Sequence, residues 1–233
     1  MIRKTLAAIA FTALTSSSAF ALTIDAFDFS QTVTDPPGGS ASTGTVFDAA
    51  SILGGERFVS VQTLTGVTSA MISINDGSNG LMTLSNSANT SSSFLLYDGV
   101  GAAGLGGVDA TEAGAQNAFD LRIVLNDFAA TIAITVGSAS GESVLSQSTG
   151  GGIPPASNIP LIFEYSNFIT TLGSGATFTA LDFIRIDISA PFQATDLQLD
   201  FFGTTNTEIP EPGSLALVGL GLAGIGLARR RRR

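Results

Sequence analysis

The residue types that are missing from this chain restrict its chemistry more than those that are present. Its 233 residues include no histidine and no cysteine. Ser-His-Asp and Cys-His catalysis is therefore excluded, and so are the imidazole and thiolate sites that usually bind zinc. The groups that remain for proton transfer are the aspartates, the glutamates and two tyrosines, Tyr97 and Tyr165.

Two carboxylates at a set separation are all that a glycoside hydrolase needs, so the composition alone does not exclude this class of enzyme. Such enzymes usually present aromatic platforms to sugar rings, and this chain contains no tryptophan. Those of its phenylalanines that recur at alternating positions are expected in the core. We therefore predict a non-catalytic binding or structural body. A carbohydrate-active enzyme that uses paired carboxylates is the alternative.

Calcium is the metal ion that suits these side chains, because it takes six to eight oxygen ligands from carboxylates, amides and carbonyls. The acids that we name as calcium ligands are Asp25, Asp28, Asp196 and Asp200. They form neither an EF-hand loop nor a nonapeptide calcium repeat. Solvated surface carboxylates are the favoured interpretation, and calcium is the alternative. No other cofactor is expected.

Apolar and polar residues alternate with a period of two, which predicts that β-strands carry these acids. The alternation is clearest in residues 119–125, 132–136, 184–188 and 197–201. Further strands are expected at residues 22–33, 81–84, 93–97 and 161–168, with a hairpin of 58–64 and 67–74 around Gly66. About ten to twelve strands without a long helical pattern predict an all-β fold, a single antiparallel β-sandwich of jelly-roll type.

The first residues of the chain form an export signal. Arg3 and Lys4 precede an apolar run from Leu6 to Leu14, and an A-x-A box follows with Ala19 and Ala21 as its small residues. This pattern is typical of a secretory signal peptide that is cleaved after Ala21. We expect export through the Sec translocon and cleavage by signal peptidase.

The last residues of the chain combine a turn, an apolar run and a basic cluster. Pro210, Glu211 and Pro212 precede sixteen uncharged residues, Gly213 to Ala228. The basic cluster consists of Arg229, Arg230, Arg231, Arg232 and Arg233. A helix of this length reaches about 24 Å, short of a hydrocarbon core of about 30 Å, and the arginines favour the cytoplasmic side. The pattern predicts a marginal anchor in the inner membrane, with the body outside.

Residues 209–233 resemble the PEP-CTERM sorting tail of Gram-negative surface proteins, which has a Pro-Glu-Pro box, an apolar helix and a basic cluster in the same order. The resemblance implies that an exosortase, a membrane-embedded cysteine protease-transpeptidase, cuts near the box. It implies a precursor held in the inner membrane and a final place at the cell surface or in the extracellular matrix, where exopolysaccharide is a further expected partner. A permanently membrane-anchored adhesin is the alternative.

These assignments divide the chain into a signal peptide (1–21), a β-sandwich domain (22–203), a linker (204–208) and a sorting tail (209–233). Residues 22–208 contain three arginines, no lysine and eighteen acids, which gives a formal charge of −15. Such a surface repels the phosphates of DNA and RNA, so no nucleic-acid partner is expected.

Overall fold

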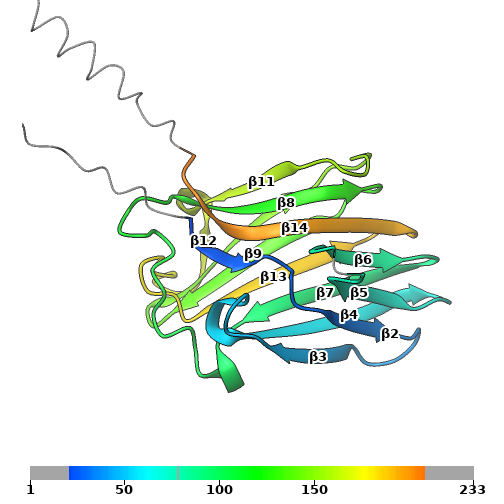
Figure 1. The fold of residues 1–233 in the computed structure, drawn as a ribbon, viewed down its shortest axis with the longest axis horizontal. Helices are drawn as coiled ribbons and strands as arrows, with labels where there is room; N and C mark the ends of the chain where they lie inside the picture. Colours follow the sequence, from blue (N-terminus) through cyan, green and yellow to red (C-terminus); the bar gives the residue numbers. More distant parts are fainter. Residues whose placement is uncertain (1–20, 78, 208–233) are drawn as a thin grey trace, which may run out of the picture.

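The computed structural model describes residues 21–77 and 79–207, which fold as two antiparallel sheets packed face to face (Figure 1). This arrangement confirms the predicted β-sandwich of jelly-roll type. Several sequence predictions lie outside the described residues: Ala19 of the cleavage box, the Pro210–Pro212 motif, the apolar run and the five arginines. Ala21 is the first described residue, and it is exposed.

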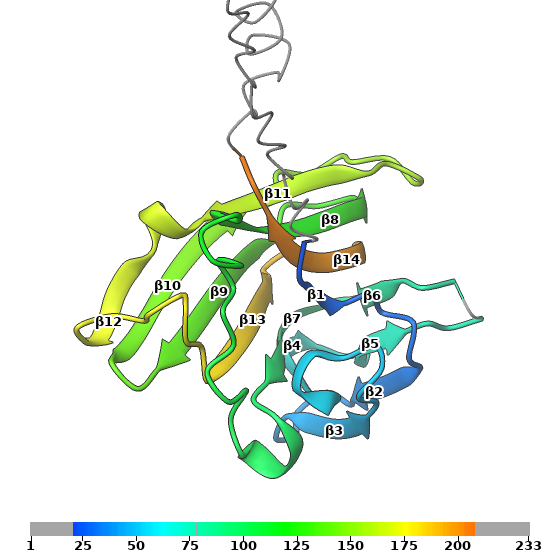
Figure 2. The same ribbon diagram turned by 60° about the vertical axis from the view of Figure 1, so that its left-hand side comes forward.

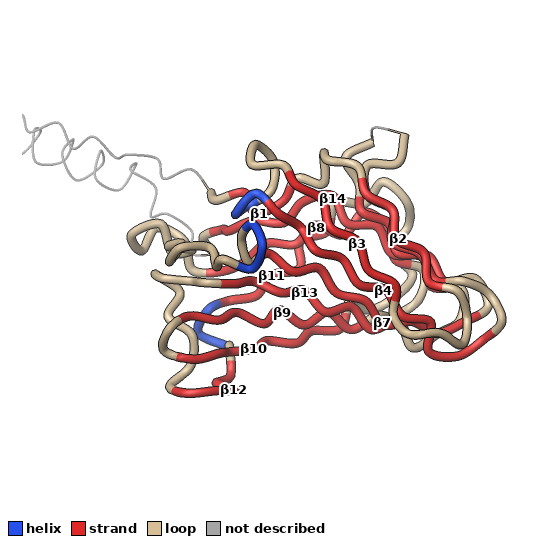
Figure 3. The backbone as a smooth tube through the Cα atoms, turned by 90° about the horizontal axis from the view of Figure 1, so that it is seen from below, coloured by secondary structure: helices blue, strands red, loops and turns tan. Residues whose placement is uncertain are grey.

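Each sheet contains seven strands in the described part of the chain. The strands of the first sheet are β1 (Thr23–Asp25), β2 (Gln31–Asp35), β5 (Ala70–Ile74), β6 (Met82–Asn86), β8 (Ala118–Asn126), β11 (Ile159–Glu164) and β14 (Thr195–Thr205). The strands of the second sheet are β3 (Ser42–Phe47), β4 (Glu56–Gly66), β7 (Asn89–Tyr97), β9 (Thr131–Ser138), β10 (Gly141–Ser148), β12 (Ile169–Gly173) and β13 (Phe183–Ala190). Figure 3 shows them as the two layers of the sandwich.

The long strand β14 lies inside the first sheet and has partners along both of its sides. On one side it pairs with β8 over nearly its whole length. On the other side it pairs first with β6 and then with the short strand β1, where Thr23 lies opposite Gly203 (Figure 2). The strand continues to Thr205, two residues into the segment expected to be a linker.

The core lies between the two sheets, as the period-two alternation requires. Ile184, Ile186 and Ile188 of β13 are at most 1% exposed, and every second residue of β9 from Ile132 to Val136 is fully buried. Three short 3-10 helices complete the described elements: η1 (Leu53–Gly55), η2 (Val100–Ala102) and η3 (Tyr165–Asn167). Within the described ranges no helix is long and apolar enough to cross a membrane.

The predicted hairpin around Gly66 is wrong. β4 pairs with β3 and β7 in the second sheet, whereas β5 pairs with β2 and β6 in the first. The chain crosses from one sheet to the other at Gly66. Its φ of +111° is a backbone conformation that glycine adopts readily and other residues rarely adopt. Alternation reveals that a segment is a strand, but it does not reveal which strand pairs with it.

Two predicted strands have different limits in the structure. The strand expected over residues 22–33 is broken at Phe27, which has a φ of +56° and donates its backbone N–H to Asp25 Oδ1 over 2.7 Å. In β14 the register shifts between Leu199 and Phe201, so Phe202 is fully buried and Phe201 only partly. A β-bulge of this kind changes the face to which the following side chains point.

Candidate functional site

Two neighbouring strands place phenylalanine rings on the outer face of the second sheet. Phe58 of β4 lies opposite Leu96 of β7, and Leu96 lies opposite Arg185 of β13. Phe94 lies one alternation before Leu96, and its ring centroid is 5.7 Å from that of Phe58 at an interplanar angle of 27°. These side chains form an apolar platform on a sheet face that is usually polar.

Arg185 extends this platform with a charged group that lies flat on it. The Arg185 guanidinium carbon is 3.9 Å from the centroid of the Phe94 ring, which is a cation–π geometry. Asp187 accepts hydrogen bonds from Arg185 Nε at 3.0 Å and from Nη2 at 2.5 Å. Ring and carboxylate together fix the plane of the guanidinium.

A cavity of about 280 Å³ adjoins the platform, and we call it the sheet-face pocket. It is lined by Glu56, Phe58, Phe94, Leu96, Asp98, Gly101, Ala102 and Arg185. Two of these are carboxylates at its rim. Glu56, only 8% exposed, accepts a 2.6 Å hydrogen bond from the Gly101 backbone N–H. Burial, and then the charge of Glu56, raise the pKa of Asp98.

A glycine-rich loop holds the carboxylate side of the sheet-face pocket in place. Gly99 has a φ of +76°, and a Cβ at this position would lie 2.2 Å from the carbonyl oxygen of Gly104. Only glycine therefore fits this turn without moving the backbone. The turn directs the Gly101 N–H toward Glu56 and fixes the orientation of that side chain.

Behind the pocket, the inward-facing neighbours of its residues form a buried polar network. Arg57 alternates with Glu56 and Phe58, and Tyr97 alternates with Leu96 and Asp98. Arg57 Nη1 lies 2.6 Å from Asp25 Oδ2, and Tyr97 Oη donates to the same oxygen over 3.0 Å. Because the network bonds these inward side chains, β4 and β7 hold the platform rigidly.

Phe29, which lies between β1 and β2, and Gln31, the first residue of β2, supply the remaining partners of Arg57. Arg57 Nε donates to Gln31 Oε1 over 2.9 Å, and Nη2 donates to the Phe29 carbonyl over 2.7 Å. All three nitrogens of the guanidinium are therefore bonded, as a buried arginine requires. Burial raises the pKa of Asp25 despite the charge of Arg57, and burial also raises that of Tyr97.

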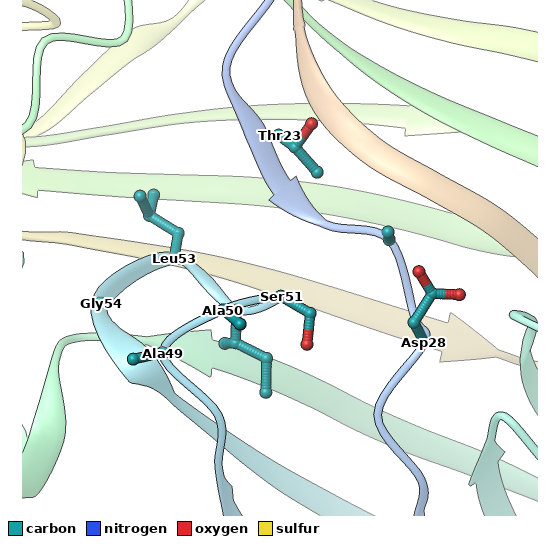
Figure 4. Close-up of a pocket in the computed structure, with 9 residues that line it drawn as sticks. Thr23, Asp28, Ala49, Ala50, Ser51, Leu53 and Gly54 are labelled. Atoms are coloured by element: carbon teal, nitrogen blue, oxygen red, sulfur yellow. The ribbon is translucent and has the colours of Figure 1, made fainter.

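A second hollow, which we call the loop pocket, lies beside β1 and has a volume of about 430 Å³ (Figure 4). Thr23 and Asp28 line one side, and residues 49–54, including Ser51, line the other. Its polar groups could donate and accept hydrogen bonds. No aromatic ring lines it, so it offers nothing on which the apolar face of a sugar could stack. We therefore regard the sheet-face pocket as the candidate site.

The structure does not bring the four predicted calcium ligands into one cluster. Asp25 is paired with Arg57, Asp28 lines the loop pocket, and Asp196 and Asp200 lie on β14. Among the described residues there is no group of three or more acidic side chains that could hold a metal ion. Solvated carboxylates stay the favoured interpretation of these acids, and calcium stays the alternative.

The two ends of the described body meet beside β14. The Leu22 N–H donates to Thr204 Oγ1 over 2.8 Å, and the Thr204 N–H donates to the Leu22 carbonyl over 2.9 Å. Further along, Asn117 Oδ1 accepts the backbone N–H of Thr207 over 2.8 Å. These contacts tie the last described residue, Thr207, to the body, three residues before Pro210.

The sequence did not predict the sheet-face pocket, because phenylalanines at alternating positions were expected in the core. Phe119, Phe163 and Phe202 are fully buried in the core, whereas Phe58 and Phe94 lie outside the core. The available signal was a run of apolar residues on both faces of an antiparallel strand, as in residues 94–97. Such a run indicates that the outer face is also apolar.

Comparison with solved structures finds similar folds at low sequence identity. A family 11 carbohydrate-binding module from Clostridium thermocellum, in complex with a β-1,3-1,4-mixed-linked tetrasaccharide, is 13% identical with a TM-score of 0.35, over 76% of this chain and 96% of that one. An exo-β-agarase is 8% identical with a TM-score of 0.42, over 81% of this chain and 25% of that one. These values carry neither a ligand nor an activity over to this chain.

Comparison with families and curated proteins concerns the end of the chain. No curated protein matches the sequence. The family described as the PEP-CTERM protein-sorting motif matches residues 208–233, which include the proline box, the apolar run and the arginines. This motif indicates an exported protein with a membrane-anchoring tail, and it implies an exosortase as the processing partner. The chain thus combines a β-sandwich with a C-terminal PEP-CTERM protein-sorting motif.

Proposed function

We propose that the body of this exported protein is a non-catalytic saccharide-binding module, which operates at the cell surface or in an exopolysaccharide matrix. The observation that carries the proposal is the sheet-face pocket. It combines stacked Phe58 and Phe94 rings with an arginine held on Phe94 and two carboxylates. Apolar surface for the C–H face of a sugar, beside fixed polar groups for its hydroxyls, is a typical composition for a ligand site.

The position of the site also suits a polymer as ligand. The pocket opens on the outer face of a sheet, and the same face continues through Thr135 of β9 and Val144 of β10, which are in register with Arg185. A long chain could therefore cross several strands, with one unit in the pocket. In such a site, the rigid strands supply a preformed surface, so little conformational entropy is lost on binding.

A glycoside hydrolase is the second candidate function, because Glu56 and Asp98 line one pocket beside aromatic rings. Burial together with the charge of Glu56 raises the pKa of Asp98, as a general acid requires. Against this role, Glu56 is almost fully buried and accepts a backbone hydrogen bond, which is a structural task. We therefore favour binding without hydrolysis.

A glycan array with the purified full-length chain in mild detergent tests the proposal. We expect retention of one class of polysaccharide and no release of reducing ends from it. Binding to no glycan contradicts the saccharide proposal. Release of reducing ends that disappears in both Glu56→Gln and Asp98→Asn identifies the hydrolase instead.

A further inference from the structure

The sheet-face pocket contains negative charge that no cation of the described residues pairs with. The described residues contain three ion pairs, Arg57–Asp25, Arg122–Asp120 and Arg185–Asp187. The only cation that lines the pocket, Arg185, is thus already paired with an acid outside its lining. Glu56 and Asp98 belong to none of these pairs, so the pocket holds two carboxylates without a partner cation.

This imbalance has an electrostatic cost in the free protein. Burial and the neighbouring charge of Glu56 both oppose ionisation of Asp98, and no cation lowers its pKa. A ligand with a positive group would relieve the repulsion between the two carboxylates. A uronic acid would add a third negative charge, and a neutral sugar would leave the repulsion unchanged.

We propose that the saccharide bound in the sheet-face pocket is an amino sugar with a free ammonium group, placed against Glu56 and Asp98. The apolar face of the same unit packs against Phe58 and Leu96, beside the Phe94 ring that Arg185 covers. This inference rests on the proposed saccharide-binding function and adds the substrate class. An ammonium offers three donors, which two carboxylates can accept. A bare calcium ion needs six to eight oxygens, whereas the lining of this pocket includes only two carboxylate side chains.

Calorimetric titration of the full-length chain in mild detergent, at neutral pH and low salt, tests the inference with three tetrasaccharides of the same β-1,4 linkage. Their units are glucosamine, N-acetylglucosamine and glucose. We expect the glucosamine tetramer to bind about fivefold tighter than the other two, as one partly screened ion pair allows. The preference should decrease when salt is added.

Single substitutions then identify the side chains that cause the preference for the glucosamine tetramer. Glu56→Gln and Asp98→Asn should each reduce it, because each removes one charge and retains the shape of the side chain. Asp76→Asn is the matched control, since Asp76 lies in an exposed turn outside the pocket and away from the second sheet, and it should leave the preference unchanged.

The outcomes separate this inference from the function on which it rests. Equal affinity for glucosamine and glucose tetramers overturns the amino-sugar assignment and leaves saccharide binding in place. A preference that persists in both acid variants overturns it as well. Binding of none of the three, together with a blank glycan array, overturns the saccharide function itself.

Discussion

Arg57 of β4 and Asp25 of β1 join the two sheets through an ion pair in which neither side chain is exposed. Because β1 belongs to the first sheet and β4 to the second, the pair spans the interior of the sandwich. A buried charge that loses its partner is strongly destabilising, whereas loss of both partners is much less so.

Substitution of Arg57 by methionine should therefore lower the free energy of unfolding by about 3–5 kcal/mol. The double variant Arg57→Met with Asp25→Asn should recover part of this loss, because no unpaired charge remains. Urea unfolding of all variants measures the difference. Arg185→Met is the control, since it breaks a half-exposed pair and should cost about 1 kcal/mol or less. Equal losses from Arg57→Met and Arg185→Met would contradict the structural role of the buried pair.

Truncation of Phe94 should weaken saccharide binding and leave the fold intact. Phe94 lies outside the core, so Phe94→Ala removes the ring beneath Arg185 without opening a core cavity. We expect affinity to fall by about tenfold or more, which corresponds to about 1.4 kcal/mol. Phe192→Ala is the matched control, because Phe192 is also a partly exposed ring, 6.2 Å from Phe128, but does not line the pocket. Similar losses in both variants would refute a specific platform.

Asp35 should make the protein sensitive to acid. Burial by itself raises its pKa, but hydrogen bonds from the Thr63 N–H and the Ser42 hydroxyl outweigh burial, and the pKa lies below its ordinary value of 3.8. A carboxyl whose pKa is lower in the folded state stabilises the fold above its unfolded pKa, and this stability is lost as the pH falls.

Asp35→Asn should therefore be less stable at neutral pH, by about 1–3 kcal/mol, and should lose less stability than the parent between about pH 5 and pH 2. Urea midpoints across this range measure the effect. Asp76→Asn, in an exposed turn, is the control and should follow the parent. Parallel curves for the parent and Asp35→Asn would show that the lowered pKa does not stabilise the fold.

Calcium should raise the melting temperature of the protein no more than matched sodium chloride does. The expectation follows from the scattered positions of Asp25, Asp28, Asp196 and Asp200 and from the lack of a cluster among the described residues. Thermal unfolding in EDTA, in calcium, in magnesium and in matched salt checks it. A calcium-specific rise of several degrees would show a site that binds only the folded state.

The exported protein should lack the five terminal arginines, because the sorting motif implies an exosortase as processing partner. Intact-mass analysis of protein released from its own cells measures this. Replacement of Pro210 and Pro212 by alanine should leave uncut precursor with the membrane fraction. Released protein that still contains Arg229 to Arg233 would favour a tail that is not processed.

The sequence predicts strands well where one face of the strand is buried and the other is exposed to solvent. Ile184, Ile186 and Ile188 illustrate this, because their burial follows directly from alternation. Pairing is different, since it depends on residues far apart in the chain. The crossing at Gly66 and the register shift before Phe201 are decided by packing between sheets, which no local pattern encodes.

The candidate site was predictable only in part. The sequence predicts paired carboxylates near aromatic rings only for the alternative, a carbohydrate-active enzyme. Glu56 and Asp98 are 42 positions apart in the chain, and they line one pocket only because β4 pairs with β7. Of the predicted acids, Asp25 has a different task, the ion pair with Arg57. A contact set by strand pairing cannot be read from the spacing of its residues.

The position of β14 determines how the body would respond to mechanical force. A surface protein that is pulled through its ligand while its tail is held experiences tension along β14, the strand that leads into residues 208–233. Backbone hydrogen bonds run across this strand to β8 on one side and to β6 and β1 on the other. The load is therefore shared by two ladders at once, whereas an edge strand would have only one.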